Sequence, residues 1–149
     1  MLFKYSAYNK YRDIKEFLIK YAYFICPLLF IAIYILVKIM ANLEIDEEFN
    51  SNIINISGIL SGFLFSSLGV MMSLPDNKFT QALRKSGYMD IIYNAMFIGI
   101  IFLIITLIFG LFKLLPAIKD ITFIIGLSET LLSAYYIYKV TKLANKSKQ

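Results

Sequence analysis

The most unusual chemical group in this sequence is the carboxyl of Glu129, which interrupts a long apolar run. Glu129 lies near the centre of the run Ile118–Tyr138, and so close to mid-bilayer if that run is a membrane helix. A carboxylate at that depth is costly and commonly marks a functional position. Its companions are spaced to share its helix face, and together they form a candidate pore lining or polar intramembrane stripe: Thr122, Gly126, Glu129 and Ser133.

Several roles of Glu129 remain open at this point. A protonated Glu129 could hydrogen-bond to hydroxyl groups such as those of Ser61, Ser66, Ser67 or Thr106 and so tie helices together. Glu129 from several subunits could instead ring a water-filled path, as acidic rings do in cation channels. A proton relay is the third possibility.

Side chains that commonly catalyse reactions are scarce. The sequence has no histidine, and its one cysteine, Cys26, lies beside Pro27 inside an apolar run. It shows no serine–lysine pair at matching depth, no glycine-rich phosphate loop and no cluster with metal-ligand spacing. We therefore expect no enzymatic activity, no metal and no cofactor.

Long apolar runs must position these side chains. The chain is 59% hydrophobic with a mean hydropathy of +0.70, more apolar than soluble domains. Each run has about the 20 residues that a helix needs to cross a bilayer core. They cover residues 21–40, 53–74, 91–115 and 118–138. The sequence predicts an all-α, polytopic membrane protein whose domain 21–138 is an antiparallel bundle of four transmembrane helices, the first a retained signal-anchor.

Basic residues are concentrated in the arm 1–20, the loop 75–90 and the tail 139–149, which share one membrane face if the chain crosses four times. They are Lys4, Lys10, Arg12, Lys15, Lys20, Lys78, Arg84, Lys85, Lys139, Lys142, Lys146 and Lys148. The first loop instead carries Glu44, Asp46, Glu47 and Glu48. The positive-inside rule therefore predicts that both termini are cytoplasmic. The third loop, with Lys113, Lys119 and Asp120, is expected to be a tight outer reversal around Pro116.

Two cytoplasmic segments could contact lipid or a partner. The arm 1–20 has the spacing of an amphipathic surface helix, although a basic tail would carry the same charges. In the loop 75–90 we expect a short helix that ends near Lys85, with Gly87 as its stop. Lys78, Arg84 and Lys85 would contact a partner or lipid, unless the loop is only an interfacial connector. Anionic lipid accounts for these bases, so no direct nucleic-acid partner is expected.

Small residues form stripes on two predicted helices. On the second helix they are Gly58, Gly62, Ser66, Gly69 and Ser73, and a weaker stripe on the third is Ala95, Gly99, Thr106 and Gly110. Small residues let helix backbones approach closely in lipid. They therefore predict packing within the bundle or between subunits of a homo-oligomer, more readily than a pore lining.

Three stretches of the sequence carry a resemblance to known proteins. They read Ile56-Ser57-Gly58-Ile59-Leu60-Ser61-Gly62-Phe63-Leu64-Phe65 and Ser73-Leu74-Pro75-Asp76-Asn77-Lys78-Phe79, followed by Leu83-Arg84-Lys85-Ser86-Gly87-Tyr88-Met89 and two apolar runs. This pattern resembles small four-pass membrane proteins of bacterial phage defence and phage exclusion, of the RexB and KwaA types. The resemblance covers about two thirds of the chain, and Glu129 is not part of it.

The resemblance implies an oligomeric protein of the bacterial inner membrane that responds to infection. Our first hypothesis is an anti-phage effector that forms an ion-conducting pore or perturbs the membrane. The second is a non-conducting anchor or sensor that recruits a cytoplasmic defence protein encoded nearby. The third is a holin-like or immunity protein of a mobile element. Expected partners are thus the lipid bilayer, further copies of the chain and a cytoplasmic protein.

Overall fold

All regular secondary structure in the described part of the chain is helical. The computed structural model describes residues 17–18, 20–41, 47–76 and 78–146, so nearly all of the predicted basic arm 1–20 lies outside it. The helices are α2 (Ala22–Ala41), α3 (Glu47–Met72), α4 (Lys78–Lys85), α5 (Tyr88–Leu111) and α6 (Pro116–Lys146). Of these, α2, α3, α5 and α6 are long and apolar enough to cross a membrane. The prediction of an all-α chain with four helices long and apolar enough to cross a membrane is therefore confirmed for the described residues.

Helix ends differ from the sequence-based ranges where turn residues or caps take effect. α3 ends at Met72, ahead of Pro75, because a proline disfavours helical geometry in the residue before it. α4 matches the expected short helix, and Gly87 has a φ of 74° in the turn after it. This left-handed geometry costs glycine little.

The largest correction concerns α6. Pro116 is its first residue, a position where proline's fixed φ and missing N–H suit a helix. The reversal therefore precedes Pro116, with Lys113 and Leu115 at φ values of 51° and 40°. Lys119 and Asp120, expected in the loop, lie in the helix and are buried. At 31 residues α6 is about 46 Å long, so most of the predicted tail 139–149 continues the helix.

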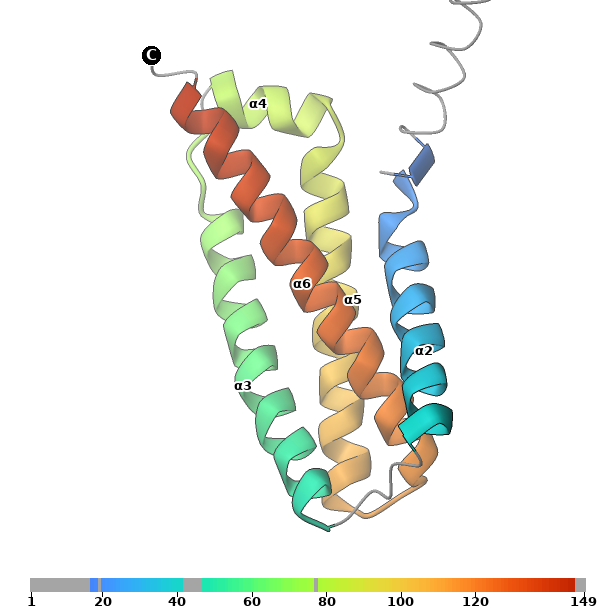
Figure 1. The fold of residues 1–149 in the computed structure, drawn as a ribbon. Helices are drawn as coiled ribbons and strands as arrows, with labels where there is room; N and C mark the ends of the chain where they lie inside the picture. The colour runs from blue at the N-terminus through green and yellow to red at the C-terminus, as the bar shows by residue number, and fades with distance from the viewer. Residues whose placement is uncertain (1–16, 19, 42–46, 77, 147–149) are drawn as a thin grey trace, which may run out of the picture.

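The long helices pack around α5 and α6 (Figure 1). α5 packs against both α6 and α3, whereas α2 packs mainly on α6. α4 lies across the end of the molecule at which α6 finishes, and the turn between α5 and α6 lies at the opposite end. Much of the surface of α2 and α3 is apolar and exposed, with Ile39 74% and Ile59 71% exposed. Such a surface is suited to lipid.

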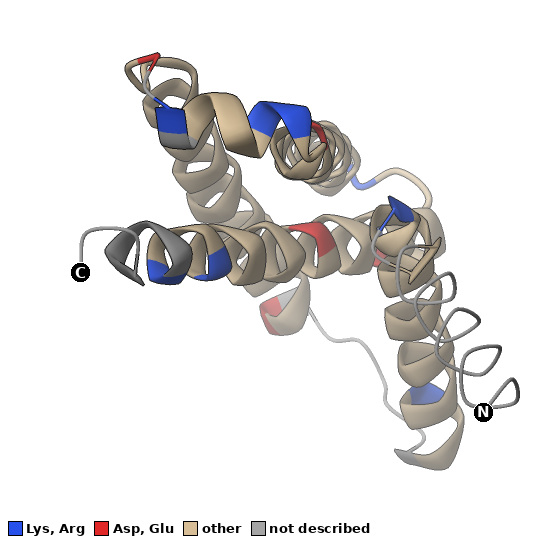
Figure 2. Ribbon diagram, turned by 90° about the horizontal axis from the view of Figure 1, so that it is seen from above, with Lys and Arg blue, Asp and Glu red and all other residues tan. Residues whose placement is uncertain are grey.

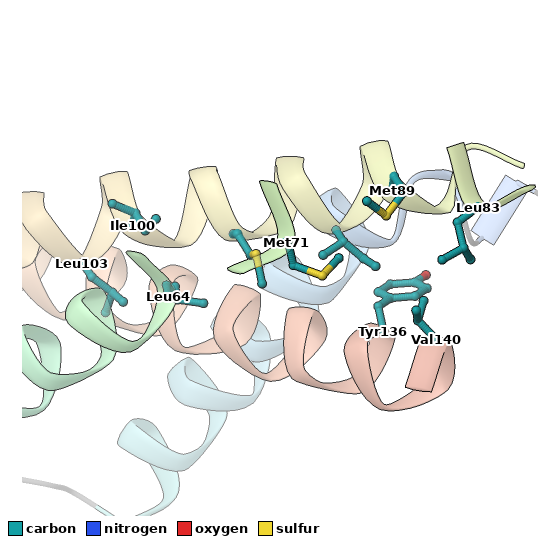
Figure 3. Packing of buried hydrophobic residues seen from close by; sticks show 10 residues of the cluster. Leu64, Met71, Leu83, Met89, Ile100, Leu103, Tyr136 and Val140 are labelled. Atoms are coloured by element: carbon teal, nitrogen blue, oxygen red, sulfur yellow. The ribbon is translucent and has the colours of Figure 1, made fainter. Parts of the chain in front are cut away.

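A buried apolar cluster follows α5 and reaches the end that α4 covers (Figure 3). Leu64 of α3 and Leu103 of α5 belong to its deeper part. At the covered end, Leu83 of α4 lies beside Tyr136 and Val140 of α6. The short amphipathic helix therefore closes one end of the bundle, while its charged residues remain outside.

Candidate functional site

The polar face of α6 lies inside the bundle. Thr122, Gly126, Glu129 and Ser133 are all buried, and Glu129 has no exposed surface. This face meets α5, because Thr122 pairs with Thr106, Gly126 lies against Leu103 and Glu129 lies against Gly99. Glu129 therefore faces the interior of its own chain. A ring of glutamates around a lumen between subunits would instead require Glu129 to face outward.

Glycines bring the neighbouring backbones close to Glu129. A Cβ placed on Gly99 of α5 would lie 3.2 Å from Cβ of Glu129 and 2.9 Å from Cδ1 of Leu64. A Cβ on Gly126 would lie 2.6 Å from Cγ of Leu103. These distances are shorter than ordinary van der Waals contacts, so only glycine fits at either position without movement of its neighbours. Glu129 is consequently buried against Gly99 of α5, and Leu64 of α3 fills the space beside that glycine.

The carboxyl group of Glu129 has no hydrogen-bond partner. Both of its oxygens are buried and unpaired. The hydroxyls expected to bind it are engaged elsewhere: Ser61 donates to the carbonyl of Gly58 and Ser66 to that of Gly62. Serine and threonine in helices often bond in this way to the preceding turn. The expected hydrogen-bonded tie between Glu129 and Ser61 or Ser66 is therefore not formed, and Ser66 is also exposed.

A threonine pair lies on the same face, one step nearer the α5–α6 turn. Oγ1 atoms of Thr106 and Thr122 are 2.9 Å apart, and Thr122 donates to the carbonyl of Lys119 at 2.8 Å. Thr106 thus pairs with Thr122 rather than with Glu129. The pair links α5 to α6 through the buried polar face.

A charged cluster beside this pair connects α6 to two further helices. The hydroxyl of Tyr34 in α2 donates to Oδ2 of Asp120 at 3.0 Å. Nζ of Lys119 donates to Oδ1 of Asn50 in α3 and lies 3.6 Å from Oδ1 of Asp120. Lys38 approaches the Tyr34 hydroxyl from the next turn of α2, at 3.5 Å. Oppositely charged side chains thus neutralise each other where three helices meet.

Sequence reasoning missed this cluster because it assigned Lys119 and Asp120 to a loop. The available signal was Pro116, which suits a first helical position, followed three and four residues later by the two charged side chains. A helix beginning at Pro116 puts both in its first turns, where they can turn toward α2 and α3.

The two stripes of small residues face in different directions. The weaker stripe on α5, which comprises Ala95, Gly99, Thr106 and Gly110, is buried. The stronger stripe on α3 points outward: Gly62, Ser66, Gly69 and Ser73 are exposed, and Gly58 is half-buried. A Cβ on Gly62 or Gly69 would meet nothing within 4 Å. The bundle of one chain therefore does not use the α3 stripe for close packing.

Basic residues are concentrated at the end that α4 covers, as the blue segments of the ribbon show (Figure 2). Lys78, Arg84 and Lys85 of α4 are exposed. Lys20, Lys139 and Lys142 lie in the segments that begin α2 and finish α6. Asp76 and Asp90 are the acidic residues in the described segments flanking α4. This end is thus distinctly positive.

Comparison with protein-family models, curated proteins and solved structures gives no match.

Proposed function

We propose that this chain is an ion-conducting effector of anti-phage defence in the bacterial inner membrane. The supporting observation is Glu129, enclosed in a membrane-spanning helix with both carboxyl oxygens unpaired. Ionisable groups at such depth are expensive and characteristically serve ion or proton pathways. A purely structural residue at this position would be better apolar, or hydrogen-bonded.

The proposed topology is an antiparallel four-helix bundle with both termini in the cytoplasm. The positive end formed by Lys20, α4 and the last turns of α6 supports this orientation, since basic segments stay on the cytoplasmic side. The described part of the opposite end carries equal numbers of basic and acidic residues. They are Lys38, Lys113 and Lys119, and Glu47, Glu48 and Asp120.

The effector is proposed to act as a homo-oligomer. The outward stripe of α3 supports this, because Gly62 and Gly69 leave room for a second backbone. The subunits would then contact each other through their α3 helices in the bilayer. Glu129 would remain inside each subunit, away from this contact.

The role in defence rests on the resemblance of residues 56–89 and the following apolar helices to RexB-type and KwaA-type proteins. Such an effector would depolarise an infected cell before new phage particles are released. Its action would be controlled from the cytoplasmic side, where the exposed residues of α4 are accessible.

A second candidate is a non-conducting anchor that recruits a cytoplasmic defence protein. The exposed basic residues of α4 favour it, since Lys78, Arg84 and Lys85 would attract an acidic partner surface. In this case, reversing these three charges would remove phage protection while leaving the membrane potential unaffected throughout infection.

The deciding experiment measures ion flux and protection together. Purified protein in liposomes is tested for passage of protons and potassium ions, and cells expressing the same chain are challenged with phage while a potential-sensitive dye is followed. Depolarisation on infection together with flux in liposomes supports the conducting effector. Protection with an unchanged potential and no flux refutes it in favour of the anchor.

A further inference from the structure

The enclosure of Glu129 restricts which ion it can carry. Gly99 of α5 lies against Glu129, and Leu64 of α3 packs beside that glycine. No described side chain hydrogen-bonds to the carboxyl group. On α6 itself, the neighbouring hydroxyls of Ser128, Thr130 and Ser133 donate to backbone carbonyls of their own helix at 2.8 to 2.9 Å. The site therefore combines one carboxyl group with a close-packed apolar wall.

Metal cations do not fit such a wall. Calcium takes about six to eight oxygen ligands, and a potassium filter replaces the hydration shell with rings of carbonyl oxygens. Glu129 belongs to no group of three or more metal-ligating side chains among the described residues, and the packing beside it is so tight that a methyl group on Gly99 would collide with Leu64. A proton needs no coordination shell, because it binds one carboxylate oxygen as a covalent O–H.

Ionisable neighbours of Glu129 are few. Among the described residues, α3 has charged groups only near its start and α5 only Asp90 near its start. α2 contributes Cys26, which interacts electrostatically with Glu129. On α6 the nearest is Tyr135, about 9 Å along the axis but exposed, and the nearest buried ones are Tyr136 and Asp120, about 10.5 and 13.5 Å along the axis at 1.5 Å per residue. No cation from these elements compensates a carboxylate at this depth, so the protonated form is the one compatible with the packed bundle.

Proton-exchanging groups lie on the same face toward both ends. The Thr106–Thr122 pair stands about 10.5 Å away toward the charged cluster of Asp120. In the opposite direction Ser133 and then Tyr136 lead to the end covered by Leu83. Between Glu129 and Thr122, Leu103 packs against Gly126, so water must enter this interval transiently for a proton to pass.

We infer that Glu129 is the proton carrier of an intramembrane pathway contained within each single chain, and that the conduction proposed above is proton-selective. This inference rests on the proposed function and specifies that the conducted ion is the proton. Starting from its protonated form, Glu129 gives its proton to a water on one side, which becomes hydronium as the O–H bond breaks. A hydronium on the other side then returns a proton to the carboxylate and remains as water, which restores the O–H bond. No further reactant is consumed.

The test uses the full chain in liposomes that contain a pH-sensitive dye, with a potential set by potassium and valinomycin. We expect proton uptake by the wild type and a decrease of about 100-fold in Glu129→Gln, the low end of what a positioned proton-transferring side chain contributes. Glutamine matches the shape of the neutral acid, so this variant should fold. Glu48→Gln is the matched control, because Glu48 is exposed at the start of α3, and it should retain wild-type flux.

Other outcomes separate the inference from the proposed function. Passage of potassium by a wild type without valinomycin, unchanged in Glu129→Gln, overturns proton selectivity and leaves a conducting effector. Absence of any flux refutes conduction. Independently of flux, infrared spectra at neutral pH should show the C=O band of a protonated carboxylic acid that disappears in Glu129→Gln. Absence of that band in the wild type overturns the assignment of Glu129 as proton carrier.

Discussion

Replacement of Gly126 by alanine should lower the free energy of unfolding, because α5 and α6 approach each other closely at this glycine. A Cβ at this position would lie 2.6 Å from Cγ and 3.3 Å from the backbone nitrogen of Leu103. The first atom is near the root of the side chain and the second belongs to a helix backbone, so neither can move away freely. Overpacking of this kind costs about 1–3 kcal/mol.

The same substitution at an outward glycine provides a matched control. Gly62→Ala and Gly69→Ala meet nothing within 4 Å, and alanine gains about 0.8–1.0 kcal/mol of helix propensity over glycine at any interior position. Because all three variants share this gain, it cancels in their comparison. Gly126→Ala should therefore be less stable than either control by about 1–3 kcal/mol, the overpacking cost alone.

The assay is equilibrium unfolding of the monomer in detergent micelles, followed by helix content as a denaturing detergent is added. Dilute protein keeps self-association out of the measurement, since the control positions lie on the proposed oligomer face. Equal stability of Gly126→Ala and Gly62→Ala would refute the close α5–α6 contact, and with it the enclosure of Glu129.

Three further predictions address other contacts. Thr106→Val should cost about 0.6 kcal/mol of unfolding free energy, the average for hydrogen bonds between membrane helices, and a double-mutant cycle with Thr122→Val should assign that energy to the pair. Lys119→Met should lower the free energy of unfolding by about 3–5 kcal/mol, because it leaves the charge of Asp120 buried without its cation. Adding Asp120→Leu should recover much of this loss. Equal stability of the single and double variants would contradict the ion pair. Isoleucine at Gly62 and Gly69 should lower cross-linking between copies without destabilising the monomer, and unchanged cross-linking would exclude the α3 stripe as the oligomer face.

Sequence composition predicted the number of membrane helices because hydropathy depends only on local content. A run of about 20 apolar residues has few alternatives to a membrane helix. The short helix α4 was also predictable, since Pro75 ends the preceding helix and Gly87 readily takes the left-handed turn that follows α4. The end of α6 was not predictable in this way, because its polar last turns remain helical beyond the apolar run.

Periodicity predicted which residues share a face but not which way each face points. The glycines of α3 and α5 have similar spacing, yet Gly62 is exposed and Gly99 is buried. The difference depends on the partner helix: Leu64 of α3 occupies the space that Gly99 leaves open. This complementarity joins residues distant in the chain, so no single run contains the information.

The charged cluster and Glu129 illustrate two solutions to the cost of burying charge. Asp120 has Lys119 within 3.6 Å and a hydrogen bond from Tyr34, so its charge is compensated where α2, α3 and α6 meet. Glu129 has neither kind of partner on the same helix only nine residues later. Because compensation was available to this fold and is absent at Glu129, a structural tie is a poor explanation for that carboxyl group. A proton that binds and leaves explains it better, since a permanent cationic partner would hold the carboxylate ionised and prevent the cycle.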